Sequence, residues 1–228
     1  MGQDSNLESV KDDFEQQENL SDKEIFTKIW TSPRKVFKYI VDRNYEKYFV
    51  ILLILAGISN AFSQAINKNM GENLPILGII LICIIAGGLF GWISFYIYAA
   101  LISWTGKWLK GKGNTDSILR IISYAMIPSI VAMALLIPQI CIVGADLFKA
   151  DYDFEGASAL STIVSGILLI ITEVLQVILS IWTFVLCIIG ISEVQKFSIG
   201  KSILNMLIPG LLLLAIVLPI VLLITILK

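Results

Sequence analysis

Five long apolar runs are the feature that most constrains this chain. A helix needs about 20 consecutive apolar residues to cross a bilayer, and the runs cover about 48–66, 74–104, 121–145, 165–191 and 203–227. The chain is 57% hydrophobic and 15% charged, whereas soluble domains are about 45–50% apolar and about 25% charged. The sequence therefore predicts an all-α, polytopic membrane protein with five transmembrane helices, preceded by N-terminal amphipathic interfacial helices.

The fourth run is the hardest to divide into spans. Residues 156–192 contain one charged side chain, that of Glu173. Two short spans would need a turn near the middle, yet residues 167–189 contain neither glycine nor proline, which most often make such turns. We therefore expect one long helix. Whether residues 157–169 cross the membrane, kink or lie on its surface is left open.

The distribution of basic residues predicts how the spans are oriented. Cytoplasmic flanks of membrane proteins collect lysine and arginine. With the N-terminus in the cytoplasm, fourteen of the 17 basic residues lie on the inner side, and only Lys68, Lys149 and Lys228 lie outside. We expect a multi-pass protein of the inner (cytoplasmic) cell membrane, and five spans place its C-terminus outside.

The first 46 residues divide into a tail and two short helices. Residues 1–24 are strongly acidic and poor in apolar side chains, which predicts a disordered cytoplasmic tail. Ser21 and Glu24 fit a capping box, and Pro33 fits the first position of a second helix. Residues 25–46 then form apolar faces with a basic rim, which favours helices lying among the lipid headgroups; packing on the end of the bundle would give the same pattern. The expected contacts to anionic headgroups are Arg34, Lys35, Lys38 and Arg43.

A polar stripe runs along the fourth span. Small and polar residues recur there about every 3.5 positions, and such a stripe should face protein because lipid offers no hydrogen-bond partners. Glu173 borders it and is the only acid within a span. Three interpretations stay open: a proton or cation site, a protonated carboxyl bonded to Asn60, Gln64 or a serine, or a residue near the outer headgroups. The candidate polar site comprises Glu173, Gln176, Thr172, Ser180 and Ser165, together with Asn60 and Gln64 of the first span.

Glycines and prolines in the other spans predict packing and kinks. Gly87 and Gly91 form a GxxxG pattern, which lets another helix approach closely; we expect a neighbouring span of the same chain to pack there, with dimerisation as the alternative. In the third span Pro128 and Pro138 each remove a backbone donor, which predicts kinks.

Several motifs together resemble the Yip1 family, specifically its bacterial-type branch. They are Ile29–Arg34 (I-W-T-S-P-R), Ser123–Pro128 (S-Y-A-M-I-P), Ile181–Trp182, and the loop with its lead-in at Ile188–Lys201. The resemblance covers about residues 25–228 and implies a five-span membrane domain over 47–228. Eukaryotic members are implied to bind prenylated small GTPases, but the D-L-Y-G-P motif of that branch is absent, so that partner is not carried over.

Enzymatic chemistry is the least supported function. The chain has no histidine, no catalytic motif and no cysteine spacing suited to metal, and the glycines and lysines of 106–113 lack the Walker spacing. We expect no cofactor, no metal and no nucleic-acid partner. A membrane-organising or scaffolding component is favoured, with anionic lipid headgroups, other membrane proteins or a second copy as partners. The alternative is a small permease for a cation, a proton-coupled solute or a lipid-like molecule, lined by the fourth-span stripe.

Overall fold

The computed structural model describes residues 19–150 and 159–226, so most of the predicted acidic tail lies outside the described residues. In this part of the chain the secondary structure is helical. The elements are α2 (Asp22–Thr31), α3 (Pro33–Asp42), α4 (Phe49–Asn67), η1 (Met70–Glu72), α5 (Ile76–Trp108), α6 (Thr115–Ala125), α7 (Ile127–Ala134), α8 (Leu136–Val143), η2 (Gly144–Phe148), α9 (Ala159–Gln195) and α10 (Ile199–Ile226).

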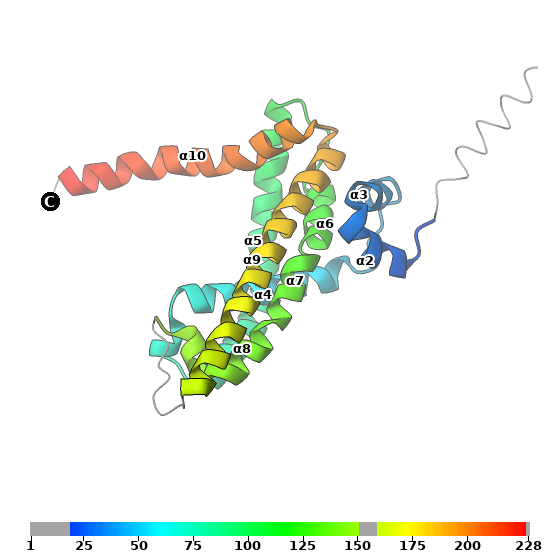
Figure 1. Ribbon diagram of the computed structural model, residues 1–228. Coiled ribbons are helices and arrows are strands. Elements are labelled where there is room, and N and C mark those ends of the chain that lie inside the picture. Colours follow the sequence, from blue (N-terminus) through cyan, green and yellow to red (C-terminus); the bar gives the residue numbers. More distant parts are fainter. Residues whose placement is uncertain (1–18, 151–158, 227–228) are drawn as a thin grey trace, which may run out of the picture.

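The predicted count of five membrane-crossing helices is confirmed over the described residues. Segments long and apolar enough to cross lie at Phe49–Asn67, Ile76–Trp108, Thr115–Phe148, Thr162–Gln195 and Ile199–Pro219. α4 packs mainly on α5, and α9 packs along α6, α7 and α8. α10 touches α5 and α9 where it begins and then extends away from them (Figure 1).

The third span is broken where its prolines predict kinks. α6 ends at Ala125 and α7 starts at Ile127 with Pro128 in its first turn. A second break at Leu135 separates α7 from α8, whose first turn contains Pro138. Each proline lacks the N–H that would continue the helical ladder.

The fourth span is one helix, as expected from its lack of turn residues. α9 runs from Ala159 to Gln195; at 1.5 Å per residue its 37 residues extend about 55 Å. Of the segment whose course was left open, residues 159–169 continue this helix, and 157–158 lie outside the described residues.

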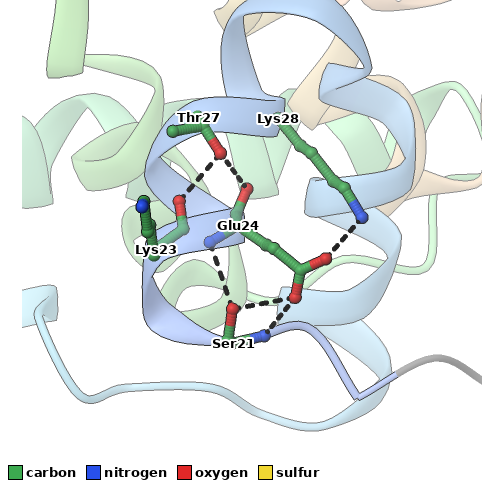
Figure 2. Close-up of polar contacts among 5 residues, drawn as sticks. All are labelled: Ser21, Lys23, Glu24, Thr27 and Lys28. Atoms are coloured by element: carbon green, nitrogen blue, oxygen red, sulfur yellow. Dashed lines mark hydrogen bonds and ion pairs between the residues drawn. The ribbon is translucent and has the colours of Figure 1, made fainter.

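The capping box at the start of α2 is present, as Figure 2 shows. Ser21 N–H donates to Glu24 Oε2 at 2.9 Å, and Glu24 N–H donates to Ser21 Oγ at 3.4 Å. Lys28 Nζ adds an ion pair to Glu24 Oε1 at 2.7 Å. At α3, Pro33 occupies the first turn, but the Ser32 side chain makes no capping bond.

The apolar faces of α2 and α3 are buried in the protein, which corrects the favoured interpretation of this region. Ile25, Ile29, Val36, Phe37 and Ile40 are 0% exposed and belong to the main core with α6 and α9. The stripe that we expected to enter the headgroup layer instead packs on the end of the bundle. An amphipathic pattern reports only that one face avoids water, so it cannot distinguish lipid from protein.

The two ends of the bundle differ in composition and in the segments they hold. One end, here called the α2–α3 end, gathers the helix pair, the α5–α6 loop and the α9–α10 linker. At the opposite end η1 and η2 pack together over a smaller core that includes Leu147 and Phe148. The segments with most of the basic residues therefore meet at one end, as expected for spans that cross alternately.

Candidate functional site

A closed polar network joins α8 to α9 inside the bundle. Gln139 is only 2% exposed; its Nε2 donates to Thr172 Oγ1 at 3.0 Å, and its Oε1 accepts from Gln176 Nε2 at 2.9 Å. The Thr172 hydroxyl donates in turn to the carbonyl of Leu169 at 2.8 Å. Hydrogen bonds between spans hold helices together because lipid cannot replace them. The sequence does not single out Gln139, because this glutamine in the third span belongs to no periodic pattern of polar residues.

Glu173 lies outside this network, on the exposed surface of α9. Its neighbours Ile170 and Val177 on the same helix are 62% and 58% exposed, and within the described part of the chain the carboxylate has no hydrogen-bond or ionic partner. The interpretation of Glu173 as a carboxyl bonded to Asn60, Gln64 or a serine is therefore wrong for the described residues. Consecutive residues are about 100° apart around a helix, so burial of Thr172 turns Glu173 outward.

The other predicted polar residues are dispersed. Asn60 and Gln64 are exposed on α4, and Ser165 is half-buried on α9. Ser180 is exposed, and its hydroxyl donates to the carbonyl of Gln176 in its own helix at 2.8 Å. Of the seven residues in the predicted site, the hydrogen bonds of the network bring together only Thr172 and Gln176.

Gly87 and Gly91 lie where α5 crosses α4. A Cβ on Gly91 would stand 2.4 Å from Gly57 Cα, and one on Gly87 would stand 2.9 Å from Gly57 O. Contacts below 3.0 Å to backbone atoms leave no room for a side chain. The GxxxG pattern thus packs against another span of the same chain, and Gly57 is its partner.

The basic residues of α3 surround the docked helix pair. Arg34 Nε lies 2.9 Å from Glu193 Oε1, an ion pair that ties α3 to the end of α9. Lys35, Lys38 and Arg43 are exposed. Arg34 therefore serves helix docking, while contact of the other three with lipid headgroups stays a prediction.

Asp22 fastens the start of α2 to the segment that leads into α4. Its carboxylate accepts from Tyr45 Oη at 2.6 Å and from Tyr48 Oη at 2.8 Å, and it pairs with Lys47. The hydrogen bond from Lys47, with those from the two tyrosines, lowers the pKa of Asp22 from 3.8 to about 2. Burial and the bond to Asp22 raise the pKa of Tyr45.

Acidification should therefore loosen the docking of α2. A carboxylate whose pKa is lowered by folding stabilises the fold above its unfolded pKa, and this contribution is lost as the pH falls through its folded pKa. For Asp22 the window runs from 3.8 down to about 2. We expect faster backbone hydrogen exchange in α2 at the bottom of this window, after correction for intrinsic exchange rates.

Two variants separate this effect from general acid unfolding. Asp22→Asn should loosen α2 already at neutral pH and reduce the change in its hydrogen-exchange rate across the window. A smaller change should persist, because Lys28 and Ser21 also lower the pKa of Glu24 to about 2. Asp42→Asn, at an exposed carboxylate, is the matched control. An unchanged profile in Asp22→Asn would show that the Asp22 contacts do not hold the helix.

A second buried polar cluster lies at the α2–α3 end, and no motif in the sequence indicates it. Gln195, the last residue of α9, is 1% exposed; its Nε2 donates to Ile102 O at 3.3 Å and its Oε1 accepts from Gly113 N–H at 3.0 Å. Asn205 of α10 is 0% exposed and donates to the same Ile102 carbonyl at 3.2 Å, while its Oδ1 accepts from Thr105 Oγ1 at 2.8 Å. We call Gln195, Thr105, Asn205 and the loop 109–114 the Gln195 junction, because these residues join α5, α9 and α10.

The junction explains why glycines stand in the last turn of α5 and in the α5–α6 loop. A Cβ on Gly106 would lie 2.1 Å from Gln195 Nε2, and a Cβ on Gly111 would lie 2.1 Å from Gln195 Oε1. At Gly113 it would lie 2.5 Å from Val194 Cγ1. The glycines therefore make room for the end of α9, and the loop's lysines point elsewhere, being exposed.

An apolar groove runs along the seam between α2 and α9. Its volume is about 470 Å³, and it is lined by Trp30, Ile178, Leu179, Ile181 and Trp182. Neither Glu173 nor the Gln139 network lines it. The lining of the groove is almost entirely apolar, so the groove supplies no polar path.

Comparison with known proteins bears on the family alone. No curated protein and no solved structure matches the chain. A family model described as the Yip1 domain matches residues 27–221, which covers the second half of α2, all of α3 to α9 and most of α10. The matched range contains all five spans and the motifs from Ile29 to Lys201. The chain belongs to the Yip1 family.

Proposed function

We propose that this Yip1-family protein is a non-enzymatic, membrane-organising or scaffolding component. Its bundle would present apolar faces to lipid and to other membrane proteins, and its α2–α3 end would contact anionic headgroups. The observation that carries the proposal is the bonding of Gln139 to Thr172 and Gln176, with Glu173 outside it. Thr172 and Gln176 of the fourth span thus join α9 to α8, so their role is structural.

The docked helix pair supports the scaffold. α2 and α3 are held by buried apolar side chains and by the pairs Arg34–Glu193 and Asp22–Lys47. They form a fixed surface continuous with the bundle, on which Lys38 and Arg43 are exposed. A charged surface that is fixed to the end of a membrane bundle is better suited to holding partners or lipids than to transporting a substrate.

For the orientation, we infer that the α2–α3 end faces the cytoplasm of the cell membrane and that the C-terminus lies outside. The junction places Lys107, Lys110 and Lys112 at the same end as the α3 basic residues. Cytoplasmic flanks collect such residues. A reporter fused after residue 228 should be accessible only from outside intact cells, and cytoplasmic accessibility would overturn the orientation.

The permease alternative is tested by flux. Purified protein and its Glu173→Gln variant are reconstituted into liposomes loaded with a pH-sensitive dye, and proton entry is followed after a pH jump with and without a potassium gradient. We expect both to match protein-free liposomes. A flux carried by the native chain and abolished by Glu173→Gln would overturn the scaffold and establish a pathway at that carboxyl.

A further inference from the structure

Five lysines gather around the Gln195 junction. Lys107 lies in the last turn of α5, and Lys112 donates its backbone N–H to Gln195 O at 3.3 Å. Lys196 directly follows Gln195. The set, here called the lysine cluster, is Lys107, Lys110, Lys112, Lys196 and Lys201; all five are exposed. In the described part of the chain none of the five has an acidic partner, whereas Arg34, Lys47 and Arg120 are each paired with one.

Two lysines of the cluster occupy backbone positions that disfavour them. α5 ends in a Schellman motif, with Gly111 N–H donating to Gly106 O at 2.8 Å, and Lys110 stands at the left-handed position with φ of 66°. α9 ends likewise, with Phe197 N–H donating to Ser192 O at 3.0 Å and Lys196 at φ of 56°. Glycine is the usual residue there because it has no Cβ penalty.

At its other described left-handed positions the chain has residues that tolerate this conformation. The other described non-glycine residues with positive φ are Asn44 and Asn69, and asparagine tolerates this conformation well. The two lysines are the exceptions, and both lie at one junction. Strained backbone is retained mainly where it serves a function, so their charge needs an explanation besides helix termination.

The surroundings indicate a lipid headgroup as the ligand. Trp104 and Trp108 lie beside Lys107 and are 50% and 53% exposed. Their rings pack edge to face with centroids 4.6 Å apart, and tryptophans favour the membrane interface. α10 begins at Ile199, between Lys196 and Lys201, with Ile199 and Ile203 exposed. The cluster therefore lies where two spans meet the membrane surface.

We propose that the lysine cluster is a binding site for the phosphate groups of anionic phospholipids in the adjacent leaflet. The Gln195 junction positions the site by holding three chain segments together. This inference rests on the proposed function and moves its lipid contact from α3 to the α5, α9 and α10 ends. Each lysine near a charged surface contributes about 1 kcal/mol, which corresponds to about a fivefold change in affinity.

The test measures lipid binding and stability together. Full-length protein is placed in nanodiscs of phosphatidylcholine with one fifth phosphatidylglycerol and is then extracted with mild detergent. The phosphatidylglycerol that stays bound to the extracted protein is quantified, and the unfolding temperature of the same sample is measured. Lys110→Gly with Lys196→Gly should lower retention about 25-fold with an unchanged or raised unfolding temperature, because glycine relieves the left-handed strain. Lys23→Gln with Lys68→Gln, two exposed lysines outside both the lysine cluster and α3, is the control and should retain the lipid.

Three results would overturn the proposal. Unchanged retention with a lowered unfolding temperature in the double glycine variant would make the lysines helix-terminating groups. An equal loss in the control would mean diffuse surface charge. Displacement of the lipid by micromolar inorganic pyrophosphate would identify a site for soluble phosphates. The flux assay is unaffected by any of these outcomes, so the inference and the scaffold can fail separately.

Discussion

Replacing Gly91 with alanine is expected to lower the free energy of unfolding by about 1–3 kcal/mol. The higher helix propensity of alanine would by itself stabilise α5 by about 1 kcal/mol. The predicted loss of stability must therefore come from the contact between α4 and α5. A Cβ at this position would stand 2.4 Å from Gly57 Cα, and a backbone atom cannot rotate aside. α4 and α5 would have to separate along their shared contact. Unfolding in mixed micelles with increasing denaturing detergent, followed by circular dichroism, measures the change.

Gly88 provides the matched control one turn away on the same helix. A Cβ there would lie 3.7 Å from Ile54 Cγ2, an ordinary contact. Gly88→Ala should leave stability unchanged or raise it slightly, whereas Gly57→Ala, with its Cβ 2.4 Å from Gly87 O, should resemble Gly91→Ala. Equal stability of the Gly88 and Gly91 variants would contradict the close crossing.

Gln195→Leu should destabilise the α2–α3 end by about 1–3 kcal/mol, the cost of leaving a buried polar group without a partner. Leucine cannot accept the Gly113 N–H bond or donate to Ile102 O. Its branched side chain also has to fit the space between Gly106 and Gly111. We expect faster hydrogen exchange in residues 109–114 and in the first turns of α10, together with a lower unfolding midpoint.

The control for this variant is another glutamine-to-leucine change. Gln64 is exposed on α4, so Gln64→Leu should preserve both the midpoint and the exchange at the junction. Should Gln195→Leu leave residues 109–114 as protected as in the native chain, the side chain would not be what joins the three segments.

The sequence predicts the helical architecture well because its signals are local. Apolar run length specifies the spans, Ser21 and Glu24 specify the start of α2, and Pro128 and Pro138 specify the breaks in the third span. The environment of an apolar face is not local. Ile25 and Phe37 must avoid water whether lipid or α9 covers them, so only the fold could show that they are buried by protein.

The contacts of the polar residues are also not local, so the sequence predicts only some of them. The period along α9 correctly singles out Thr172 and Gln176, but Gln139 and Asn205 are isolated in their own spans, and their partners lie on other helices. Glu173 stands one residue from the buried stripe, and that single step places it on the exposed surface. The glycines at 106–113 fit no known motif in the sequence, and only the fold shows that Gly106 and Gly111 make room for Gln195 and that Gly113 makes room for Val194.

Thr172 and Gln176 of the fourth span are bonded within the protein, whereas Glu173 faces outward. Spin labels at positions 170, 173 and 177 of a chain without its three cysteines report access to dissolved oxygen and to a water-soluble nickel chelate in bilayers. We expect position 173 to behave like its exposed neighbours 170 and 177, with access changing smoothly with depth. Strong access of the nickel chelate at 173, with oxygen dominant at both neighbours, would place that residue in a water-filled path and contradict the outward position of Glu173.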